Sequence, residues 1–409
     1  MKKLYLLADE WDRDRNFVGE ELKLICEKYD VTVICNSAST GMEPKARYLV
    51  YSRPSLPYAF ISLIKGLADR DLWREMGAAA VYRSDVNATL FGRISEVIRF
   101  YINADLFRRY MKKQNCFEND AVYYSYWNFW KCYAVTRDIH KYQGSRVISR
   151  IHGYDLYDVR MPSGYQPFKN SMDMKLDRLI FISEMGKEYY LHRHGKKDSD
   201  KYGLYLLGTE RGVEEKRVRD HYGDHNDGLL IVSCSRIDDV KRVERIVEAL
   251  SYITDFRILW VHFGAGNLEQ KVKDTAARIL DDKDNIRYEF KGQVENHEIH
   301  DFYKKNMPDL FITASSSEGN PVSVMEAMSY GIPVVAPAIC NFPKMINGCG
   351  ILVDAKCEAS DLANAIRRVK GMSPVELGQL RDNAYRCWDR SFNADKNNQR
   401  FIKEVLDVL

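Results

Sequence analysis

Long uninterrupted apolar runs are missing from this chain of 409 residues. No uncharged stretch approaches the roughly 20 apolar residues of a membrane-spanning helix, so any membrane contact is expected to be peripheral. The opening apolar segment, residues 4–8, is shorter than the roughly 7–15 residues of a signal-peptide core and runs directly into Asp9 and Glu10. We therefore interpret this segment as a first buried strand.

Few prolines, a small net charge and the lack of paired cysteines exclude several classes of protein. Only 11 prolines accompany a hydrophobic content of 45%, which excludes a disordered chain. The 61 basic and 58 acidic residues leave a net charge of only +3, so bulk nucleic-acid binding is not expected, although a local basic patch stays open. The nine cysteines are scattered and never form a C-x-x-C pair. This favours a reduced, cytoplasmic setting over a disulfide framework or a structural zinc site.

The length fits two domains of about 200 residues each. Both halves alternate short apolar runs with amphipathic stretches, which is the pattern of parallel sheets with helices on both faces. A polar, glycine-punctuated stretch separates them. We place a first domain at residues 1–207, a linker at 208–226 and a second domain at 227–392, and expect the final helix, 393–409, to pack back on the first domain.

Two segments of the first half are candidate ligand contacts. Residues 9–16 are dense in charge and follow the first strand. We interpret them as a loop at the carboxyl edge of the sheet, where doubly wound proteins bind ligands. His152 follows another predicted strand, and the adjacent Gly153 would allow a ligand to approach closely. A structural role for this single histidine is the alternative.

Residues 54–113 combine aromatic and basic side chains in long helical stretches. One interpretation is a pair of ordinary core-facing helices with solvated outer faces. The other is a basic, aromatic face that rests on an anionic bilayer. The residues concerned are Phe60, Ile61, Ile64, Lys65, Leu67, Trp73, Arg74, Phe91, Arg93, Ile94, Ile98, Arg99, Phe100, Tyr101, Phe107, Arg108, Arg109, Tyr110, Lys112 and Lys113.

The second half centres on residues 314–337, which read A-S-S-S-E-G-N-P-V-S-V-M-E-A-M-S-Y-G-I-P-V-V-A-P. A buried strand leads through a loop into a helix with Asn320 as the expected N-cap and Pro321 as the expected first residue. The free N–H groups and the dipole of such a terminus suit a phosphate. Glu318 precedes this helix and Glu326 lies inside it. Solvated flank acids are the alternative, but Glu326 sits in an apolar run, where a carboxylate needs a partner.

A cationic pair follows the first strand of the second half, in the segment S-R-I-D-D-V-K. Arg236 offers a planar fork and Lys241 a mobile point charge, which together suit a diphosphate. An exposed surface pair is the alternative, but the position at a strand's carboxyl end favours a ligand. Gly264 and Gly266 form a weaker G-x-G signal. It lacks the third glycine of the dinucleotide fingerprint, which disfavours a dehydrogenase, and a tight turn explains it equally well.

These two segments resemble the signatures of the large retaining glycosyltransferase family with the GT-B fold. The resemblance is carried by Glu318 and Glu326, with seven residues between them, and by S-R-I-D-D-V-K. It is dense over residues 229–354, with isolated points at R-I-H-G-Y-D (150–155) and L-G-T (207–209). The sequence is similar in style to enzymes of bacterial capsule, exopolysaccharide and lipopolysaccharide assembly. The resemblance implies an α/β protein with two doubly wound parallel-sheet domains that face each other across a cleft.

The resemblance also implies an activity. The chain would be a retaining, metal-independent hexosyltransferase without a cofactor, moving a sugar from a nucleoside-diphosphate sugar, UDP in preference to GDP, to a hydroxyl of a glycan or lipid-linked glycan. The first domain would bind the acceptor and the second the donor. Such an enzyme would be cytoplasmic, peripheral on the inner face of the plasma membrane, without a nucleic-acid partner. A sugar-nucleotide epimerase of the same fold and a non-catalytic binding relative are the alternatives.

The family's functional residues carry over position by position. Arg236 and Lys241 would hold the donor diphosphate and neutralise the leaving group. Glu318 would reach the donor sugar, Glu326 would accept the ribose hydroxyls, and His152 would close on the sugar near the reacting carbon. Arg236, Lys241, Glu318 and His152 thus form the implied catalytic set. The further implied donor contacts are Gly292, Gln293 and Val294 beside the nucleobase, and Gly319, Asn320, Ser323 and Val324 at sugar or phosphate.

Overall fold

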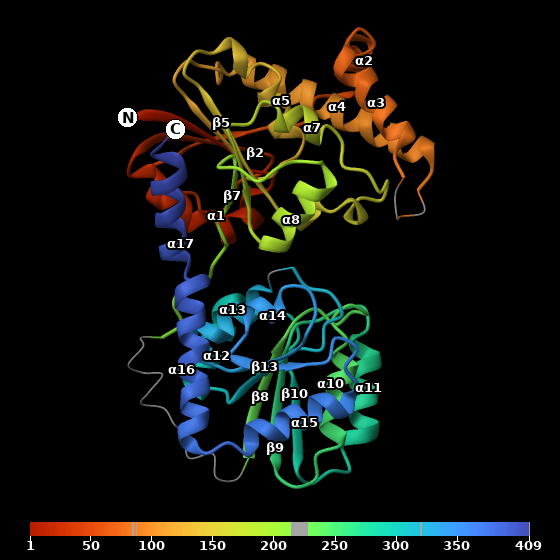
Figure 1. Ribbon diagram of the computed structural model, residues 1–409, viewed down its shortest axis with the longest axis vertical. Coiled ribbons are helices and arrows are strands. Elements are labelled where there is room, and N and C mark those ends of the chain that lie inside the picture. The colour runs from red at the N-terminus through yellow and green to blue at the C-terminus, as the bar shows by residue number, and fades with distance from the viewer. Residues whose placement is uncertain (84–85, 87, 214–227, 320, 409) are drawn as a thin grey trace. The chain divides into compact units, whose positions relative to one another are not determined.

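The computed structural model describes residues 1–83, 86, 88–213, 228–319 and 321–408. The chain divides into two compact units: Met1–Leu206 with Asp395–Leu409 form unit 1, and Leu207–Ala394 form unit 2 (Figure 1). Most of the predicted linker, 208–226, lies outside the described residues. Each unit holds one parallel sheet with helices, which confirms the predicted α/β class. No helix in the described part of the chain has the length and apolar character needed to cross a bilayer.

The sheet of unit 1 has seven strands in the order β3-β2-β1-β4-β5-β6-β7, all parallel. The central strand β1 pairs Leu6 with Val33 on one side and with Tyr124 on the other. Its last four residues are buried, as expected of a strand covered on both faces. The strands are β1 (Lys2–Leu7), β2 (Tyr29–Cys35), β3 (Arg47–Val50), β4 (Val122–Ser125), β5 (Arg146–Ile151), β6 (Arg178–Phe181) and β7 (Tyr202–Leu204).

Two hydrophobic clusters cover the two faces of this sheet. One joins β1 to α1 and to the C-terminal residues from Phe401 onward, where the hydroxyl of Tyr29 donates to the carbonyl of Leu406 at 2.8 Å. The other joins the sheet to α4 and α5. The helices of unit 1 are α1 (Trp11–Cys26), α2 (Leu56–Gly66), α3 (Arg70–Val81), α4 (Leu90–Lys113), α5 (Trp130–Thr136), α6 (Gly153–Leu156), α7 (Lys169–Asp173), α8 (Glu184–Arg193) and α17 (Ala394–Phe401), with short turns at Ile139–Lys141, Asp158–Arg160 and Ile402–Leu406.

Two expectations for unit 1 were wrong. The charged stretch 9–16 is not a loop, because α1 already begins at Trp11. Trp11 is buried in the core, and the carboxylate of Asp14 accepts the backbone N–H of Asp9 at 2.8 Å. These two contacts stabilise the start of a helix that the high density of charged residues did not predict. Residues 54–113 form three helices, α2, α3 and α4, instead of two.

Unit 2 repeats the architecture with six parallel strands in the order β10-β9-β8-β11-β12-β13. Apolar residues from β8, β9, β11 and α10 form its main core. The strands are β8 (Gly228–Cys234), β9 (Arg257–Phe263), β10 (Ile286–Phe290), β11 (Leu310–Ile312), β12 (Val334–Pro337) and β13 (Gly350–Val353). The helices are α10 (Val243–Ser251), α11 (Glu269–Leu280), α12 (Asn296–Asn306), α13 (Val322–Ser329), α14 (Phe342–Met345), α15 (Ala359–Lys370) and α16 (Pro374–Ser391).

Candidate active site

The strand order of unit 2 brings two of the predicted segments together. β8 lies between β9 and β11, and the chain leaves β8 toward β9, so the loops after β8 and β11 diverge from neighbouring strands. This is the topological switch point, where open parallel sheets bind ligands. The loop after β8 carries Arg236 and Lys241, and the loop after β11 carries Glu318.

Lys241 and Glu318 are in direct contact. The Nζ of Lys241 lies 2.5 Å from Oε1 of Glu318, and the hydroxyl of Ser315 donates to the same oxygen at 2.7 Å. The two charged side chains are only 21% and 11% exposed, so the pair is partly shielded from solvent. The structure therefore brings together two residues that the sequence analysis placed on the diphosphate and on the sugar.

Arg236 lies in the same loop but at its surface. Its side chain is 78% exposed, and Nη2 lies 3.0 Å from Oδ2 of Asp238. Asp238 also accepts the backbone N–H of Lys241 at 3.0 Å, which shapes the turn between the two cations. The guanidinium is thus loosely held, whereas the ammonium of Lys241 has a fixed partner.

Arg242 joins the loops after β8 and β11, a role that sequence reasoning missed. Its Nε donates to the carbonyl of Ala314 at 2.7 Å and its Nη2 to the carbonyl of Ser315 at 3.2 Å. The N–H of Ser316 donates in turn to the carbonyl of Val240 at 2.8 Å. Arg242 adopts a positive φ of 50°, uncommon for a residue other than glycine. Its only sequence signal is its position directly after S-R-I-D-D-V-K.

The glycine turn after β9 supports the loop after β8 from its other side. Gly264 has a φ of 125°, and a Cβ atom there would lie 1.9 Å from the carbonyl oxygen of Ser235. A Cβ at Gly266 would lie 2.2 Å from the carbonyl oxygen of Ile237, whose N–H donates to Ala265 at 3.1 Å. The G-x-G pattern is therefore a tight turn that allows close backbone packing beside Arg236.

Gly264→Ala is expected to lower the free energy of unfolding by about 3 kcal/mol or more, because the new methyl group meets backbone at a strained φ. Chemical denaturation of the full chain, followed by circular dichroism, would measure this change. Gly77→Ala is the matched control. Gly77 lies in α3, and no atom of the described residues lies within 4 Å of the position that a Cβ would occupy there. This control should be neutral or stabilising by up to about 1 kcal/mol. Equal stability of the two variants would contradict the supporting role.

Glu326 is buried in α13 and has the partners that its setting requires. The amide Nδ2 of Asn296 donates to its Oε1 at 2.9 Å, and Nε2 of His300 lies 3.7 Å from that oxygen. Nδ1 of His300 lies 2.9 Å from the hydroxyl of Tyr330. Asn296 and His300 come from α12, and no local sequence pattern linked them to Glu326.

The start of α13 differs by one residue from the prediction. The helix begins at Val322, and Pro321 occupies the N-cap position in an extended conformation with a ψ of 110°. Asn320, the predicted N-cap, lies outside the described residues. The fixed φ of proline suits both positions, so sequence alone does not separate them.

The other predicted donor contacts lie on the loop after β10, on the loop before α13 and in the first turn of α13. Gly292 has a positive φ of 68°, and its carbonyl accepts the N–H of Gly264 at 2.8 Å, which connects the β10 and β9 loops. The N–H of Val324 donates to the carbonyl of Pro321 at 3.2 Å. Gln293 and Gly319 are exposed or partly exposed, as are Val294 and Ser323, and Val324 is buried.

His152 lies in unit 1, at the end of β5. Its ring packs on Trp127 and Tyr126 at centroid distances of 4.3 and 4.8 Å, and its backbone N–H donates to Oδ1 of Asp155 at 2.6 Å. Burial and the neighbouring Arg150 hold the pKa of His152 well below its usual range, so the imidazole is neutral at pH 7. Neither ring nitrogen makes a hydrogen bond to any of the described residues.

Further polar residues gather near His152 at the switch point of unit 1, between β1 and β4. Lys131 is buried, bonds the carbonyl of Ala8 and places Nζ 3.2 Å from Oδ1 of Asp9. Oδ2 of Asp14 accepts from the indole N–H of Trp127 at 3.2 Å. Sequence reasoning missed Lys131 and Trp127, because a lysine and a tryptophan among core aromatics give no distinct pattern. Within the described ranges, no group of three or more His, Cys, Asp or Glu residues is placed to hold a metal ion.

Comparisons with known proteins agree with this geometry. Residues 214–385 match the family described as Glycosyl transferases group 1. TuaC of Bacillus subtilis (strain 168), named as a putative teichuronic acid biosynthesis glycosyltransferase, is 27% identical over 191 residues, 46% of this chain and 44% of TuaC. The O-antigen biosynthesis glycosyltransferase WclY of Escherichia coli is 23% identical over 52% of this chain and 59% of WclY. The chain spans about half the length of these relatives.

Solved structures resemble the chain over its whole length. Anabaena HepE (Alr3699), in complex with UDP and glucose, has a TM-score of 0.62 at 16% identity, with 100% of both chains covered. The lipopolysaccharide outer core galactosyltransferase WaaB has a TM-score of 0.63 at 13% identity, also with 100% of both chains covered. At such low identity the likeness concerns the fold. Residues 214–385 are thus similar to the glycosyl transferases group 1 family, and the chain as a whole has the GT-B fold.

Proposed function

We propose that the chain is a retaining glycosyltransferase that moves a hexose from a nucleoside-diphosphate sugar, in particular a UDP-sugar, to a hydroxyl of a glycan or lipid-linked glycan in bacterial surface polysaccharide synthesis. The observation that carries this proposal is the 2.5 Å contact of Lys241 with Glu318 at the switch point of unit 2. The match of residues 214–385 to the group 1 family supports it. The names of TuaC and WclY, and the UDP bound to HepE, suggest the substrate classes.

The proposed chemistry depends on electrostatics and positioning. The bond between the sugar's anomeric carbon and the diphosphate breaks, and the acceptor oxygen forms a new bond to that carbon on the same face. The acceptor's proton passes to the departing diphosphate oxygen. Arg236 and Lys241 neutralise the leaving group, a task that in other enzymes falls to a divalent metal, and Glu318 holds the ammonium of Lys241 in place. Glu326 is assigned to the ribose and His152 to the sugar.

Nucleotide binding tests this proposal directly. A ligand at about 100 times its dissociation constant stabilises the folded state by about 2.7 kcal/mol. UDP should therefore raise the thermal unfolding temperature, whereas uridine, which lacks the diphosphate, should not. Absence of a shift with every nucleoside diphosphate would refute the proposal. Sugar release that does not depend on any acceptor would instead favour an epimerase or hydrolase on the same fold.

The surroundings of His152 predict a pH dependence of transfer. Burial raises the pKa of Asp155 to about 6, against the opposing effect of the nearby Lys169. The ionised carboxylate accepts the backbone N–H groups of His152 and Asn128, at 2.6 and 2.5 Å. As the pH falls through 6 this carboxylate gains a proton and holds both amides less firmly. Transfer is therefore expected to be about halved at pH 6 and about tenfold lower at pH 5 than at pH 8.

Asp155→Asn tests the assignment of this inflection. The variant has no carboxylate to titrate, so its rate should be lower than that of the wild type at pH 8 but flat between pH 5 and pH 8. Circular dichroism at pH 5 would check that both proteins stay folded. An inflection near pH 6 that persists in Asp155→Asn would assign it to another group.

The proposed acceptor sets the place of reaction. A lipid-linked glycan lies in the membrane, so the proposal puts the chain in the cytoplasm, in peripheral contact with the inner face of the plasma membrane. Such contact requires an outward surface that combines apolar and basic side chains.

A further inference from the structure

Helix α2 buries small residues and exposes its large apolar residues. Its two buried residues, Ser62 and Gly66, are small, whereas its large apolar side chains face outward. Phe60 is 62% exposed and Ile64 is 51% exposed, and a spacing of four residues puts them on one face of the helix. In a soluble domain the large side chains normally face the core. The other exposed apolar residues of α2 are Leu56, Tyr58 and Ile61.

Close packing holds α2 in this orientation. A Cβ atom at Gly66 would lie 2.9 Å from side-chain atoms of both Leu72 and Tyr101, so α2 approaches α3 and α4 more closely than a larger residue permits. Rotating α2 to bury Phe60 or Ile64 would put a large side chain at this contact. The apolar face is therefore turned outward by the packing of unit 1 itself.

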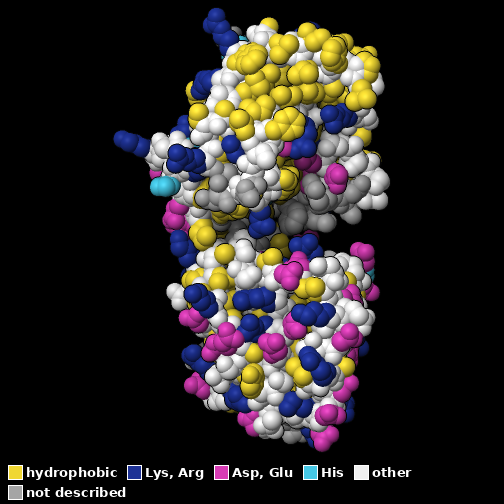
Figure 2. Space-filling view, turned by 90° about the vertical axis from the view of Figure 1, so that its right-hand side faces the viewer, with side chains coloured by type: hydrophobic (Ala, Val, Ile, Leu, Met, Phe, Trp, Pro, Cys, Tyr) yellow, Lys and Arg dark blue, Asp and Glu magenta, His cyan; other side chains and the backbone are white. Residues whose placement is uncertain are grey.

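The apolar surface continues onto the neighbouring helices. Figure 2 shows hydrophobic side chains gathered over one face of unit 1. Trp73 of α3 is half exposed, and its ring N–H donates to the carbonyl of Leu67 at 2.8 Å, which fixes the indole beside the end of α2. Single exposed apolar residues need no explanation, but a gathered patch marks an interaction site. The exposed large apolar residues that follow α2, on α3 and at the start of α4, are Leu67, Trp73, Val81, Leu90 and Phe91.

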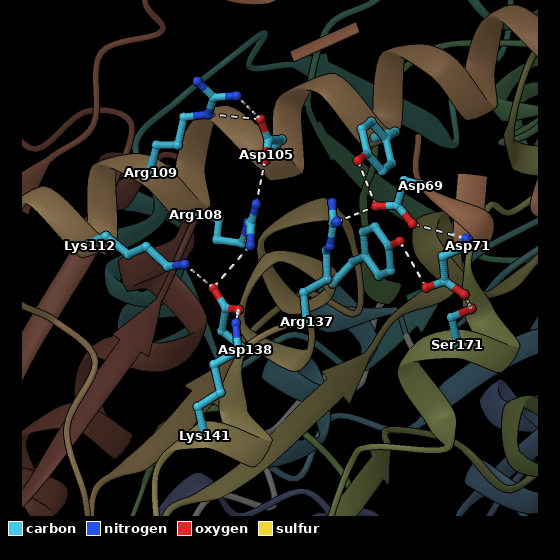
Figure 3. A network of polar contacts seen from close by, with 12 residues as sticks. Asp69, Asp71, Asp105, Arg108, Arg109, Lys112, Arg137, Asp138, Lys141 and Ser171 are labelled. Atoms are coloured by element: carbon cyan, nitrogen blue, oxygen red, sulfur yellow. Dashed lines mark hydrogen bonds and ion pairs between the residues drawn. The ribbon is translucent and has the colours of Figure 1, made fainter. Parts of the chain in front are cut away.

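The acidic side chains of the same helices point into unit 1 (Figure 3). Asp69, the N-cap of α3, forms an ion pair with Arg137, and Asp71 accepts from the hydroxyl of Tyr133 at 3.1 Å. Glu75 is buried and accepts two hydrogen bonds from within the unit. Among the described residues between 53 and 113, every acid is buried or partly buried.

The basic side chains of α2 and α3 point outward. Lys65, Arg70 and Arg74 are exposed on α2 and α3. On α4, in contrast, Arg108 and Arg109 form ion pairs with the buried Asp105, so these cations neutralise a buried carboxylate (Figure 3). The outward surface of α2 and α3 therefore combines large apolar side chains with positive charge and carries no exposed acid among its described residues.

We propose that the outer face of α2 and α3, with the first turn of α4, docks the chain on a bilayer that contains anionic lipid. Phe60, Ile64 and Trp73 would enter the boundary between headgroups and acyl chains, and the basic residues would meet lipid phosphates. A second copy of the chain is a poorer occupant, because self-association of this face would oppose its own cations. The inference rests on the proposed function only for the choice of leaflet.

Vesicle flotation of the full chain tests the docking surface. Vesicles with about 30 mol% phosphatidylglycerol in phosphatidylcholine should bind the protein at low salt, and pure phosphatidylcholine should bind it at least about tenfold more weakly. Phe60→Ser with Ile64→Ser should lower the partition coefficient by about 30-fold or more, since both lose their apolar contact. Lys65→Gln with Arg74→Gln should lower it about tenfold and reduce its salt dependence.

Matched controls come from exposed residues of unit 2. Tyr252→Ser with Val375→Ser removes apolar side chains of similar exposure, and Lys304→Gln with Lys305→Gln removes two exposed cations. Both should bind vesicles as the wild type does. The inference would be overturned if the wild-type protein did not bind anionic vesicles. It would also be overturned if the control pairs lost as much binding as the test pairs. The inference would also be overturned if the wild type formed oligomers and Phe60→Ser with Ile64→Ser dissociated them, since the face would then bind a second copy.

The thermal shift with UDP separates this inference from the proposed function. The docking variants lie in unit 1, away from Arg236 and Lys241 in the sequence, and should keep the wild-type shift. A chain that binds UDP but no vesicle would refute the docking surface alone. A chain that binds vesicles but no nucleotide would refute the proposed transferase alone.

Discussion

Lys241→Ala is expected to lower kcat for sugar transfer by about 10³-fold, the largest single effect expected for this chain. The ammonium of Lys241 is partly buried and fixed 2.5 Å from Glu318, so it is already in place when negative charge develops on the departing diphosphate. Its removal should also weaken UDP binding about 10-fold or more, the value of a charge-assisted hydrogen bond. Steady-state kinetics and calorimetry with UDP would measure the two effects separately.

Lys271→Ala is the matched control for this substitution. Lys271 pairs with Glu244 at 2.9 Å in the same unit, but the Lys271 side chain is exposed and solvent screens the pair, so its loss should leave both the stability and kcat close to those of the wild type. Arg236→Ala should act in the same direction as Lys241→Ala but more weakly, because solvent screens a side chain that is 78% exposed. A Lys241→Ala protein that folds and turns over at the wild-type rate would refute the assignment of the diphosphate site.

The alternation of strands and helices could be predicted because it is a local property of the sequence. Runs such as Leu4–Leu7 and Leu310–Ile312 are short, apolar and bounded by polar segments, and the structure buries them in parallel sheets. The apolar run around Glu326 likewise predicted a buried carboxylate, which the structure contains. Each of these inferences needed only a window of a few residues.

The partners of the site residues could not be predicted, because they depend on contacts between distant segments. Asn296 reaches Glu326 across 30 positions, and Arg242 reaches Ala314 across 72. Which face of α2 points outward could not be predicted either. Its composition suits either a buried helix or a membrane-facing one, and only the packing of Gly66 against α3 and α4 turns the apolar residues outward.

His152→Phe is expected to lower kcat about 10²-fold while leaving the fold at least as stable as that of the wild type. The phenyl ring can keep the packing on Trp127 and Tyr126. Both imidazole nitrogens are buried and make no hydrogen bond to the described residues, and burying such atoms costs about 1–3 kcal/mol each. A stable apolar replacement of a buried polar ring is the pattern of a residue kept for function at the expense of stability.

The location of the donor site distinguishes a catalytic His152 from a structural one. Arg236, Lys241 and Glu318 lie in unit 2, so His152→Phe should bind UDP with wild-type affinity, unlike Lys241→Ala. Because His152 is neutral throughout the working pH range, its loss should lower transfer by the same factor at pH 7 and pH 8. A structural histidine would give the opposite result, namely a lower unfolding temperature at an unchanged kcat. A loss of kcat without a loss of stability would place the imidazole at the reacting sugar.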